Sequence, residues 1–248
     1  MKNVEYLEMI RKYFPKAFYS EDIFQFVFSF IRKELNLSID KVILGDSICA
    51  DEINSMEYPS TAYELLGPFK LGGLNGYPFT GITGLSAFFQ HVPNDGAAII
   101  YYGPHIGITE DESIGQVMRV GQEVTSSCCG ALDYGLKVLK GKAVIQEKDD
   151  YQMSVLSEML EENKERIMNS SDEYVEATKV IYEKVDSKIG ELLSKASFPS
   201  RFIILIGGIL INTDKGVDSY FDCNKLLCLD MKNKEEMDIL PMAIDKLL

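Results

Sequence analysis

Three short stretches of the chain carry one of its two histidines and three of its five cysteines, residue types that can bind a metal ion or act as nucleophiles. Cys49 and Asp51 follow a predicted strand, His105 follows a second predicted strand, and Cys128 and Cys129 open a predicted helix. Because the strand ends of an α/β sheet converge on one crevice, we expect these side chains to meet there. Two thiolates and one imidazole form a zinc-ligand set that leaves a fourth position open, as in catalytic zinc sites.

These residues also have ordinary structural interpretations. A cysteine at a strand end is more often a small buried hydrophobe than a ligand, and a lone histidine after a strand is commonly a hydrogen-bonded structural residue. No closely spaced CxxC pair marks a metal site. Cys128 and Cys129 point in different directions from a helix start, so at most one of them should face a metal. Cys223 and Cys228 are predicted to be core or surface thiols.

Two further patterns argue against other kinds of site. Residues 67–84 contain six glycines and two prolines but lack the spacing of a nucleotide-binding loop. This segment cannot be a regular helix or a central strand, so we predict a long loop or a set of turns. The pair Ser126-Ser127 lacks the G-x-S-x-G elbow of a serine hydrolase, and one of the two serines is expected to cap the helix that follows.

The elements that must position these residues follow from the apolar pattern. Residues 41–48 and 97–102 predict strands, the second of them apolar throughout and therefore buried on both faces. Residues 201–212 predict a strand, or a pair of strands pinched at two glycines. Helical spacing predicts a helical segment at 1–36 and a charged helical insertion at 150–196. We therefore predict one α/β domain over residues 1–248 with helical additions.

Composition and charge exclude several classes of protein. With 46% hydrophobic and 25% charged residues in 248, the chain is globular rather than disordered. A net charge of −13 argues against nucleic-acid binding, which needs a basic footprint. The longest apolar run, 202–211, is too short for a membrane helix, which needs about 20 residues. Acidic residues near the start argue against a targeting peptide, and five cysteines fit a reducing compartment, so we expect a cytoplasmic protein.

Five motifs resemble, in order, those of the limiting-CO2-inducible protein B family, which is similar to β-carbonic anhydrases in its zinc site. They are CADEIN at 49–54, GGLNGYPFTGITG at 72–84, HVP at 91–93, YYGPHIGI at 101–108 and CGA at 129–131. Five ordered motifs are far more specific than any one of them. The resemblance implies a mostly parallel central sheet flanked by helices, a homodimer, and a Zn2+ ion held by Cys, His and Cys.

Carried over residue by residue, the resemblance makes Cys49, His105 and Cys129 the zinc ligands. Asp51 matches the aspartate of the Cys-x-Asp pattern, which would accept a hydrogen bond from the zinc-bound water or ligate the metal in a closed resting form. His91 has no counterpart as a ligand and is a candidate proton relay. The implied function is a zinc-dependent carbonic anhydrase, a lyase in which zinc-bound hydroxide attacks CO2 and bicarbonate leaves.

One position departs from the pattern. In β-carbonic anhydrases an arginine two residues after the aspartate pairs with it, but that residue here is Ile53. We expect some family members to carry an arginine two residues before the first cysteine, where this chain has Ser47. Arg119 is a cation that would have to reach in from elsewhere. Without such a cation activity would be low, and the alternative is a catalytically weak or silent zinc-binding homologue that binds bicarbonate or a partner protein. A zinc hydrolase with a larger pocket walled by 67–84 is a third possibility.

Overall fold

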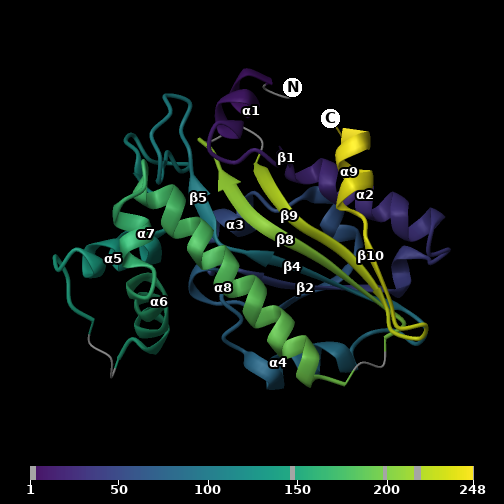
Figure 1. The fold of residues 1–248 in the computed structure, drawn as a ribbon. Helices are drawn as coiled ribbons and strands as arrows, with labels where there is room; N and C mark the ends of the chain where they lie inside the picture. The colour runs from purple at the N-terminus through teal and green to yellow at the C-terminus, as the bar shows by residue number, and fades with distance from the viewer. Residues whose placement is uncertain (1–3, 146–148, 198–199, 215–218, 248) are drawn as a thin grey trace.

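A mixed sheet forms the centre of the molecule, with helices on both of its faces (Figure 1). The computed structural model describes residues 4–145, 149–197, 200–214 and 219–247. Its main sheet has the strand order β1-β9-β8-β4-β2-β3, with β5 beside β8 and β10 beside β9. The strands of this sheet are β1 (Ala17–Tyr19), β2 (Val42–Ile48), β3 (Leu66–Lys70), β4 (Ala97–Gly103), β5 (His105–Gly107), β8 (Phe202–Asn212), β9 (Tyr220–Asp230) and β10 (Glu235–Asp238).

Most of the central strands run parallel. Parallel pairing joins β3 to β2, β2 to β4, and β4 and β5 to β8, whereas β9 pairs antiparallel with β8, β1 and β10. A mostly parallel central sheet is therefore confirmed. A separate antiparallel pair, β6 (Gln116–Val117) and β7 (Ser126–Ser127), closes the loop before the helix that starts at Gly130.

Helices cover the two faces of the sheet. The α-helices are α1 (Val4–Arg11), α2 (Ser20–Lys33), α3 (Glu52–Met56), α4 (Gly81–Gln90), α5 (Gly130–Leu139), α6 (Tyr151–Glu161), α7 (Lys164–Met168), α8 (Glu173–Lys195) and α9 (Leu240–Leu247). Short 3-10 turns are η1 (Ile39–Lys41), η2 (Ser60–Glu64) and η3 (Leu74–Gly76). The long helix α8 crosses one face against β4 and β8, and α2 and α9 belong to the other face (Figure 1).

The strand β4 explains why the sheet needs helices on both sides. Its alternate residues enter different cores: Ile99 and Tyr101 join the core that includes α2 and α9, and Ile100 and Tyr102 join the core that includes α5 and α8. All four are buried. Burying each large side chain contributes about 1.5–3 kcal/mol, so both layers of helices are needed to exclude water from this apolar run.

The predicted strands form where the apolar runs indicated. Residues 41–48 give β2, and 97–102 give β4. The predicted segment 201–212 contains the single strand β8 rather than two strands. The two glycines mark a shift in its register against β9, between Gly207 and Gly208. An irregularity of this kind bends a strand without ending it, which is why the glycines did not break it.

The other predicted segments show smaller differences. Residues 67–84 contain the edge strand β3 and the turn η3, as glycine-rich sequence favours, but α4 already begins at Gly81. The segment 1–36 forms α1 and α2 with the short strand β1 between them, and its first three residues lie outside the described part. Residues 150–196, where helical spacing indicated helices, contain α6, α7 and α8.

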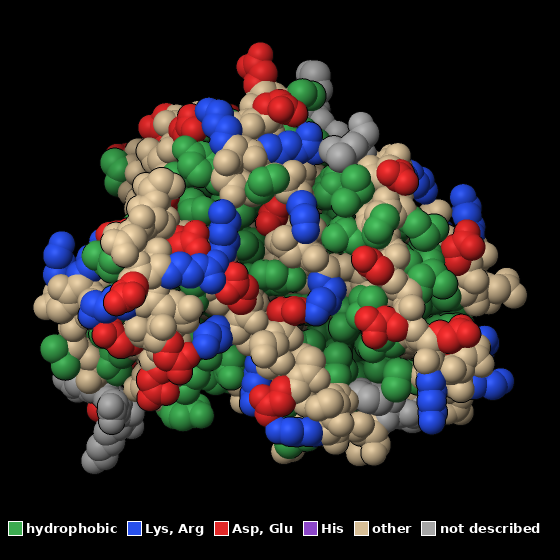
Figure 2. All heavy atoms as spheres, viewed as in Figure 1, with side chains coloured by type: hydrophobic (Ala, Val, Ile, Leu, Met, Phe, Trp, Pro, Cys, Tyr) green, Lys and Arg blue, Asp and Glu red, His purple; other side chains and the backbone are tan. Residues whose placement is uncertain are grey.

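The surface carries both signs of charge. On the face shown in Figure 2, acidic and basic side chains are interspersed with apolar ones. Ion pairs between successive helix turns or neighbouring helices account for part of this pattern, for example Arg166 with Glu183 and Lys184 with Glu162. Among the described residues, no helix combines the length and the apolar character needed to cross a membrane.

Candidate metal centre

Three buried side chains from three different elements come together at the carboxyl ends of the central strands. Cys49 follows β2 directly, His105 begins β5, and Cys129 precedes the first residue of α5. One potential ligand atom from each lies within 4.8 Å of the others. Their exposed fractions are 5%, 0% and 4%. Cys49, His105 and Cys129 are thus arranged so that they could bind one metal ion, in agreement with the expected convergence of strand ends.

The ring of His105 is oriented for ligation through Nε2. Its Nδ1 lies 2.7 Å from Oδ1 of Asn212. Its Nε2 is buried and has no hydrogen-bond partner among the described residues. A buried ring nitrogen without a partner is costly unless a ligand occupies it. This orphaned nitrogen and the two adjacent sulfurs fit a zinc ion.

The thiols of the group are strongly polarised. The backbone N–H of Asn75 donates to Sγ of Cys49 at 3.2 Å, and Sγ of Cys129 donates to Oδ1 of Asn75 at 3.0 Å. A hydrogen bond from Cys129 lowers the pKa of Cys49 well below its usual value, although burial acts in the opposite direction. Burial alone would lower the pKa of His105, but the neighbouring cysteine sulfurs raise it well above its ordinary value. These shifts favour a thiolate at Cys49.

The glycine-rich turn η3 brings Asn75 close to the strand ends. Gly76 has φ +72, and a Cβ there would lie 2.2 Å from the carbonyl oxygen of Gly103. The hydroxyl of Ser47 donates to the carbonyl oxygen of Gly76 at 2.8 Å. Only glycine permits this close approach, so the turn can place Asn75 against both cysteines.

The adjacent cysteines have different positions. Cys129 occupies the N-cap of α5, and its sulfur faces Cys49 and His105. Sγ of Cys128 instead lies 3.6 Å from Nδ1 of His105 and 3.4 Å from Oδ1 of Asn212, on the ring nitrogen that the metal would not use. The prediction that Ser126 or Ser127 caps this helix is wrong, because both serines belong to β7 and the chain turns into the helix only after them.

Arg119 is the cation that pairs with Asp51. Its Nη2 lies 3.1 Å and 3.2 Å from the two carboxylate oxygens of Asp51. Asp51 itself caps α3, accepting from the backbone N–H of Ile53. Burial and a hydrogen bond with Glu52 raise the pKa of Asp51, and Arg119 acts in the opposite direction. An Asp–Arg pair, which the sequence did not reveal, is therefore present. Its arginine comes from the segment between β6 and β7.

Every donor group of Arg119 has an acceptor. Nε donates to Glu52 at 2.7 Å, and Nη2 also donates to the carbonyl oxygen of Cys128 at 2.8 Å. Nη1 donates to Oγ of Ser126 and to the carbonyl oxygen of Ser127, both at 2.9 Å. The guanidinium thereby ties Asp51 to the backbone that leads into Cys129.

Two other positions named from the sequence as places for an arginine hold buried side chains without charge. Ile53, where β-carbonic anhydrases would have an arginine, is buried in a small apolar cluster with Val117 and Cys128. Ser47 is also buried, and its hydroxyl is engaged with the turn η3. An arginine at either position would therefore displace buried neighbours.

His91 lies away from the described contacts of the group. It is an exposed residue at the C-cap of α4, and its ring meets that of Phe69 edge-on, with centroids 5.6 Å apart. The structure does not bring it into the group of three ligands, so a role as a proton relay stays a prediction.

Sequence reasoning missed three residues that surround the group. Asn75, Asn212 and Glu57 contact the candidate ligands directly or through one another. Asn75 stands within a motif already singled out, and Asn212 ends a predicted strand, but neither position carries a signal in its local spacing. Only the pairing of β5 with β8 brings Asn212 to His105.

A central α/β sheet with a buried Cys-His-Cys group beside an Asp-Arg pair defines a β-carbonic anhydrase-like protein. The profile of the limiting CO2-inducible proteins B/C β-carbonic anhydrases matches residues 18–230. The chain belongs to this family, as the resemblance of its motifs implied. A comparison with curated protein sequences finds no match.

Solved structures share the fold. PtLCIB4, a homolog of the limiting CO2-inducible protein LCIB, superposes with a TM-score of 0.81 at 24% identity, covering 94% of this chain and 98% of that chain. LCIB itself superposes with a TM-score of 0.71 at 20% identity, covering 93% and 97%. At these identities the likeness establishes the fold, and the chemistry must be argued from the residues of this chain.

Proposed function

We propose that the protein is a zinc-dependent carbonic anhydrase that interconverts CO2 and bicarbonate. The observation that carries the proposal is the buried Cys49–His105–Cys129 group next to an Asp51 carboxylate that is held by Arg119. Three protein ligands leave one position of a tetrahedral site for a small molecule. Family membership supports the same chemistry.

Cys49, His105 and Cys129 would hold the zinc ion through two sulfurs and Nε2 of the imidazole. When bound, zinc acts as a Lewis acid and makes a water nucleophilic near neutral pH, which is the chemistry that CO2 hydration requires. Bulk water has little access to the position between the three ligands, because all three are almost fully buried. Asn75 contributes a backbone N–H to the sulfur of Cys49, which moderates the negative charge on that ligand.

Asp51 would orient the attacking water by accepting its hydrogen bond at a carboxylate oxygen. Its two oxygens are both within hydrogen-bond distance of Arg119, and this pairing opposes direct ligation of the metal by the carboxylate. The open fourth position thus depends on Arg119. The lack of a cation for Asp51 favoured a catalytically silent homologue. Arg119 supplies that cation, so this argument for a silent homologue no longer applies.

Two measurements test the proposal. Protein purified without chelator is expected to contain about one zinc per chain, and 18O exchange between CO2 and water should exceed the rate in buffer. The variant Cys49→Ser should lose both the metal and the exchange. Cys228→Ser is the matched control, because Cys228 is equally buried but lies on β9, outside the group of ligands.

The outcomes separate the alternatives. Zinc without exchange would contradict the enzyme and favour the silent homologue, whereas absence of zinc in the wild type would contradict the metal site itself. We also propose a homodimer, to be tested by light scattering, and a cytoplasmic location, to be tested by cell fractionation. Five buried cysteines, all free, are compatible with a reducing compartment.

A further inference from the structure

A chain of hydrogen bonds leads from His105 to a partly buried carboxylate that the proposed chemistry does not use. We infer that Asn212 and Glu57 are positioning residues that select the imidazole tautomer needed for metal binding, with Asn212 acting on His105 and Glu57 acting on Asn212. The inference rests on the metal site of the proposed function and adds to it the residues that aim one of its ligands.

Asn212 is placed for this role by the sheet. It ends β8, which pairs parallel with β5, and only 1% of its surface is exposed. Its Oδ1 lies 2.7 Å from Nδ1 of His105. An amide oxygen can only accept a hydrogen bond, so Nδ1 must carry the proton. The lone pair of the neutral ring is then at Nε2, the buried nitrogen that faces the cysteines without a partner.

Glu57 determines which way the amide of Asn212 points. Nδ2 of Asn212 donates to Oε2 of Glu57 at 2.8 Å. Because Oε2 of Glu57 accepts from Nδ2, the amide oxygen Oδ1 is left to face His105. With the amide reversed, an N–H would point at Nδ1 and the proton of the ring would have to move to Nε2, which would block ligation. The thiol of Cys128, which donates to the same Oδ1 at 3.4 Å, favours the observed orientation.

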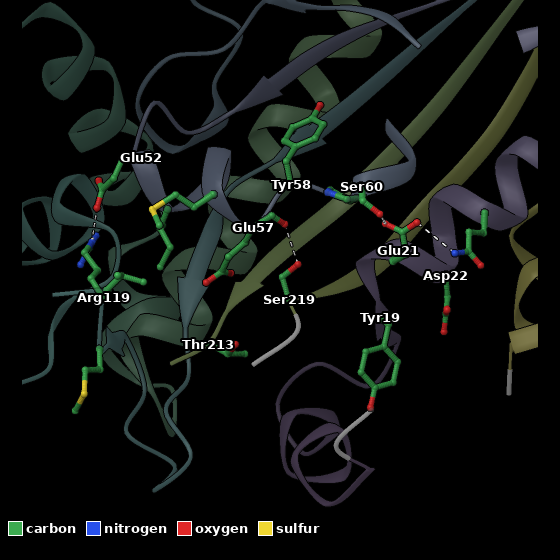
Figure 3. A pocket seen from close by; sticks show the side chains of 16 residues that line it. Tyr19, Glu21, Asp22, Glu52, Glu57, Tyr58, Ser60, Arg119, Thr213 and Ser219 are labelled. Atoms are coloured by element: carbon green, nitrogen blue, oxygen red, sulfur yellow. Dashed lines mark hydrogen bonds and ion pairs between the residues drawn. The ribbon is translucent and has the colours of Figure 1, made fainter. Parts of the chain in front are cut away.

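The helix α3 connects this chain with the Asp51–Arg119 pair. Asp51 is the N-cap of α3 and Glu57 is its C-cap, so one short helix carries at its two ends the carboxylate that pairs with Arg119 and the carboxylate that bonds Asn212. The carbonyl oxygen of Glu57 accepts from Oγ of Ser219 at 3.0 Å, which fixes the end of the helix. Figure 3 shows Glu57 and Arg119 lining the same pocket, whose volume is about 650 Å³.

A purely structural role would also explain these hydrogen bonds, so the test must report on the metal. Zinc affinity is measured by competition with a chelator for wild-type protein, Asn212→Ala and Glu57→Ala. We expect Asn212→Ala to weaken zinc binding by about 10- to 100-fold, as for other residues that orient metal-binding histidines. Glu57→Ala should weaken it by less. The control is Glu21→Ala, because Glu21 lines the same pocket but is bonded to Ser60 and Thr61.

An exchange of donor and acceptor gives a sharper test. Asn212→Asp alone places two carboxylates against each other and should weaken zinc binding. The double variant Asn212→Asp/Glu57→Gln restores one acceptor for Nδ1–H and one donor between the two residues, so zinc affinity should return to within about threefold of the wild type. Failure of this rescue in a folded double variant would overturn the role of Glu57.

The tautomer itself is observable. The chain has two histidines, so 15N spectra of zinc-loaded His91→Gln protein report on His105 alone. Ligation through Nε2 with a proton on Nδ1 is expected. Ligation through Nδ1, or unchanged zinc affinity in Asn212→Ala, would overturn the inference while leaving the proposed function intact. A wild-type protein that binds no zinc would instead contradict the proposed metal site.

Discussion

Two neighbouring cysteines with the same chemistry have different environments in this protein. The sulfur of Cys129 joins Cys49 and His105, whereas that of Cys128 lies beside the opposite nitrogen of the imidazole. Burial raises the pKa of the Cys128 thiol, which favours its neutral form. A neutral thiol can donate to Asn212, as a thiolate ligand could not. The two side chains therefore make separate contacts despite their adjacency.

Replacing each of these cysteines in turn tests this division. Cys129→Ser should lose zinc, because serine offers a weaker ligand in place of a thiolate. Cys128→Ser should retain about one zinc per chain, since its hydroxyl can still donate to Asn212. Metal analysis after dialysis distinguishes the two variants, and the reverse result would show that Cys128 is the ligand.

Both the charge and the planar shape of the Arg119 guanidinium contribute to its contacts beside the candidate metal centre. Its guanidinium reaches Asp51, Glu52 and three acceptors of the segment 126–128. Arg119→Lys keeps the positive charge but cannot supply these donors in the same plane. We expect 18O exchange to fall about 10- to 100-fold through misplacement of Asp51, with zinc content unchanged. Exchange equal to that of the wild type would show that Asp51 does not need this geometry.

At the scale of elements, the candidate metal centre depends on close contact between backbone segments. The strands β4 and β5 are joined at Gly103, which has φ +147, and a Cβ at this position would lie 1.7 Å from the carbonyl oxygen of Gly208 in β8. His105 follows Gly103 by two residues and begins β5. The glycine is thus required by the approach of two strands, and no side chain could relieve the overlap by rotating.

Gly103→Ala is expected to lower the free energy of unfolding by more than about 2 kcal/mol, because the methyl group would overlap a backbone atom in a disfavoured conformation. Gly190→Ala is the matched control. Gly190 is exposed within α8 and nothing lies near its Cβ position, so alanine there should raise stability by up to about 1 kcal/mol. Urea unfolding measures both. A loss at Gly103 no larger than roughly 0.5 kcal/mol, the effect of a surface substitution, would contradict the steric argument.

At the scale of the whole molecule, stability is linked to pH through groups that the fold buries. Burial raises the pKa of Glu57 to about 7, although hydrogen bonds from Asn212 and the backbone at Thr213 act in the opposite direction. The pKa in the folded state exceeds the ordinary value of 4.5, so the folded protein binds this proton more tightly than the unfolded chain. The stabilisation from this group is therefore complete below pH 4.5 and is lost as pH rises through about 7.

Comparison with Glu57→Gln isolates this contribution. In the metal-free protein, the free energy of unfolding of the wild type should fall relative to that of the variant as pH rises from about 4.5 to about 7. Urea unfolding of both proteins across this range measures the difference. A difference that stays constant with pH would contradict the raised pKa of Glu57.

Local pattern by itself determined the main elements and the residue types of the site. The apolar runs of β2 and β4, the spacing of α8 and the ordered motifs around Cys49, His105 and Cys129 were readable because burial on a strand or helix face leaves a periodic signal along the chain. The sequence also indicated the family, because the motifs of the family are short and occur in a fixed order.

Tertiary structure alone decided which partners these residues have. It placed the sulfur of Cys129, and not that of Cys128, in the group with Cys49 and His105, brought Arg119 to Asp51, and brought Asn212 and Glu57 to the Nδ1 side of His105. Each of these contacts joins segments that are far apart in the chain or depends on the direction of a single turn. Local spacing does not encode such contacts, because they arise from the pairing of strands and from the side-chain orientations that pair most buried donors and acceptors.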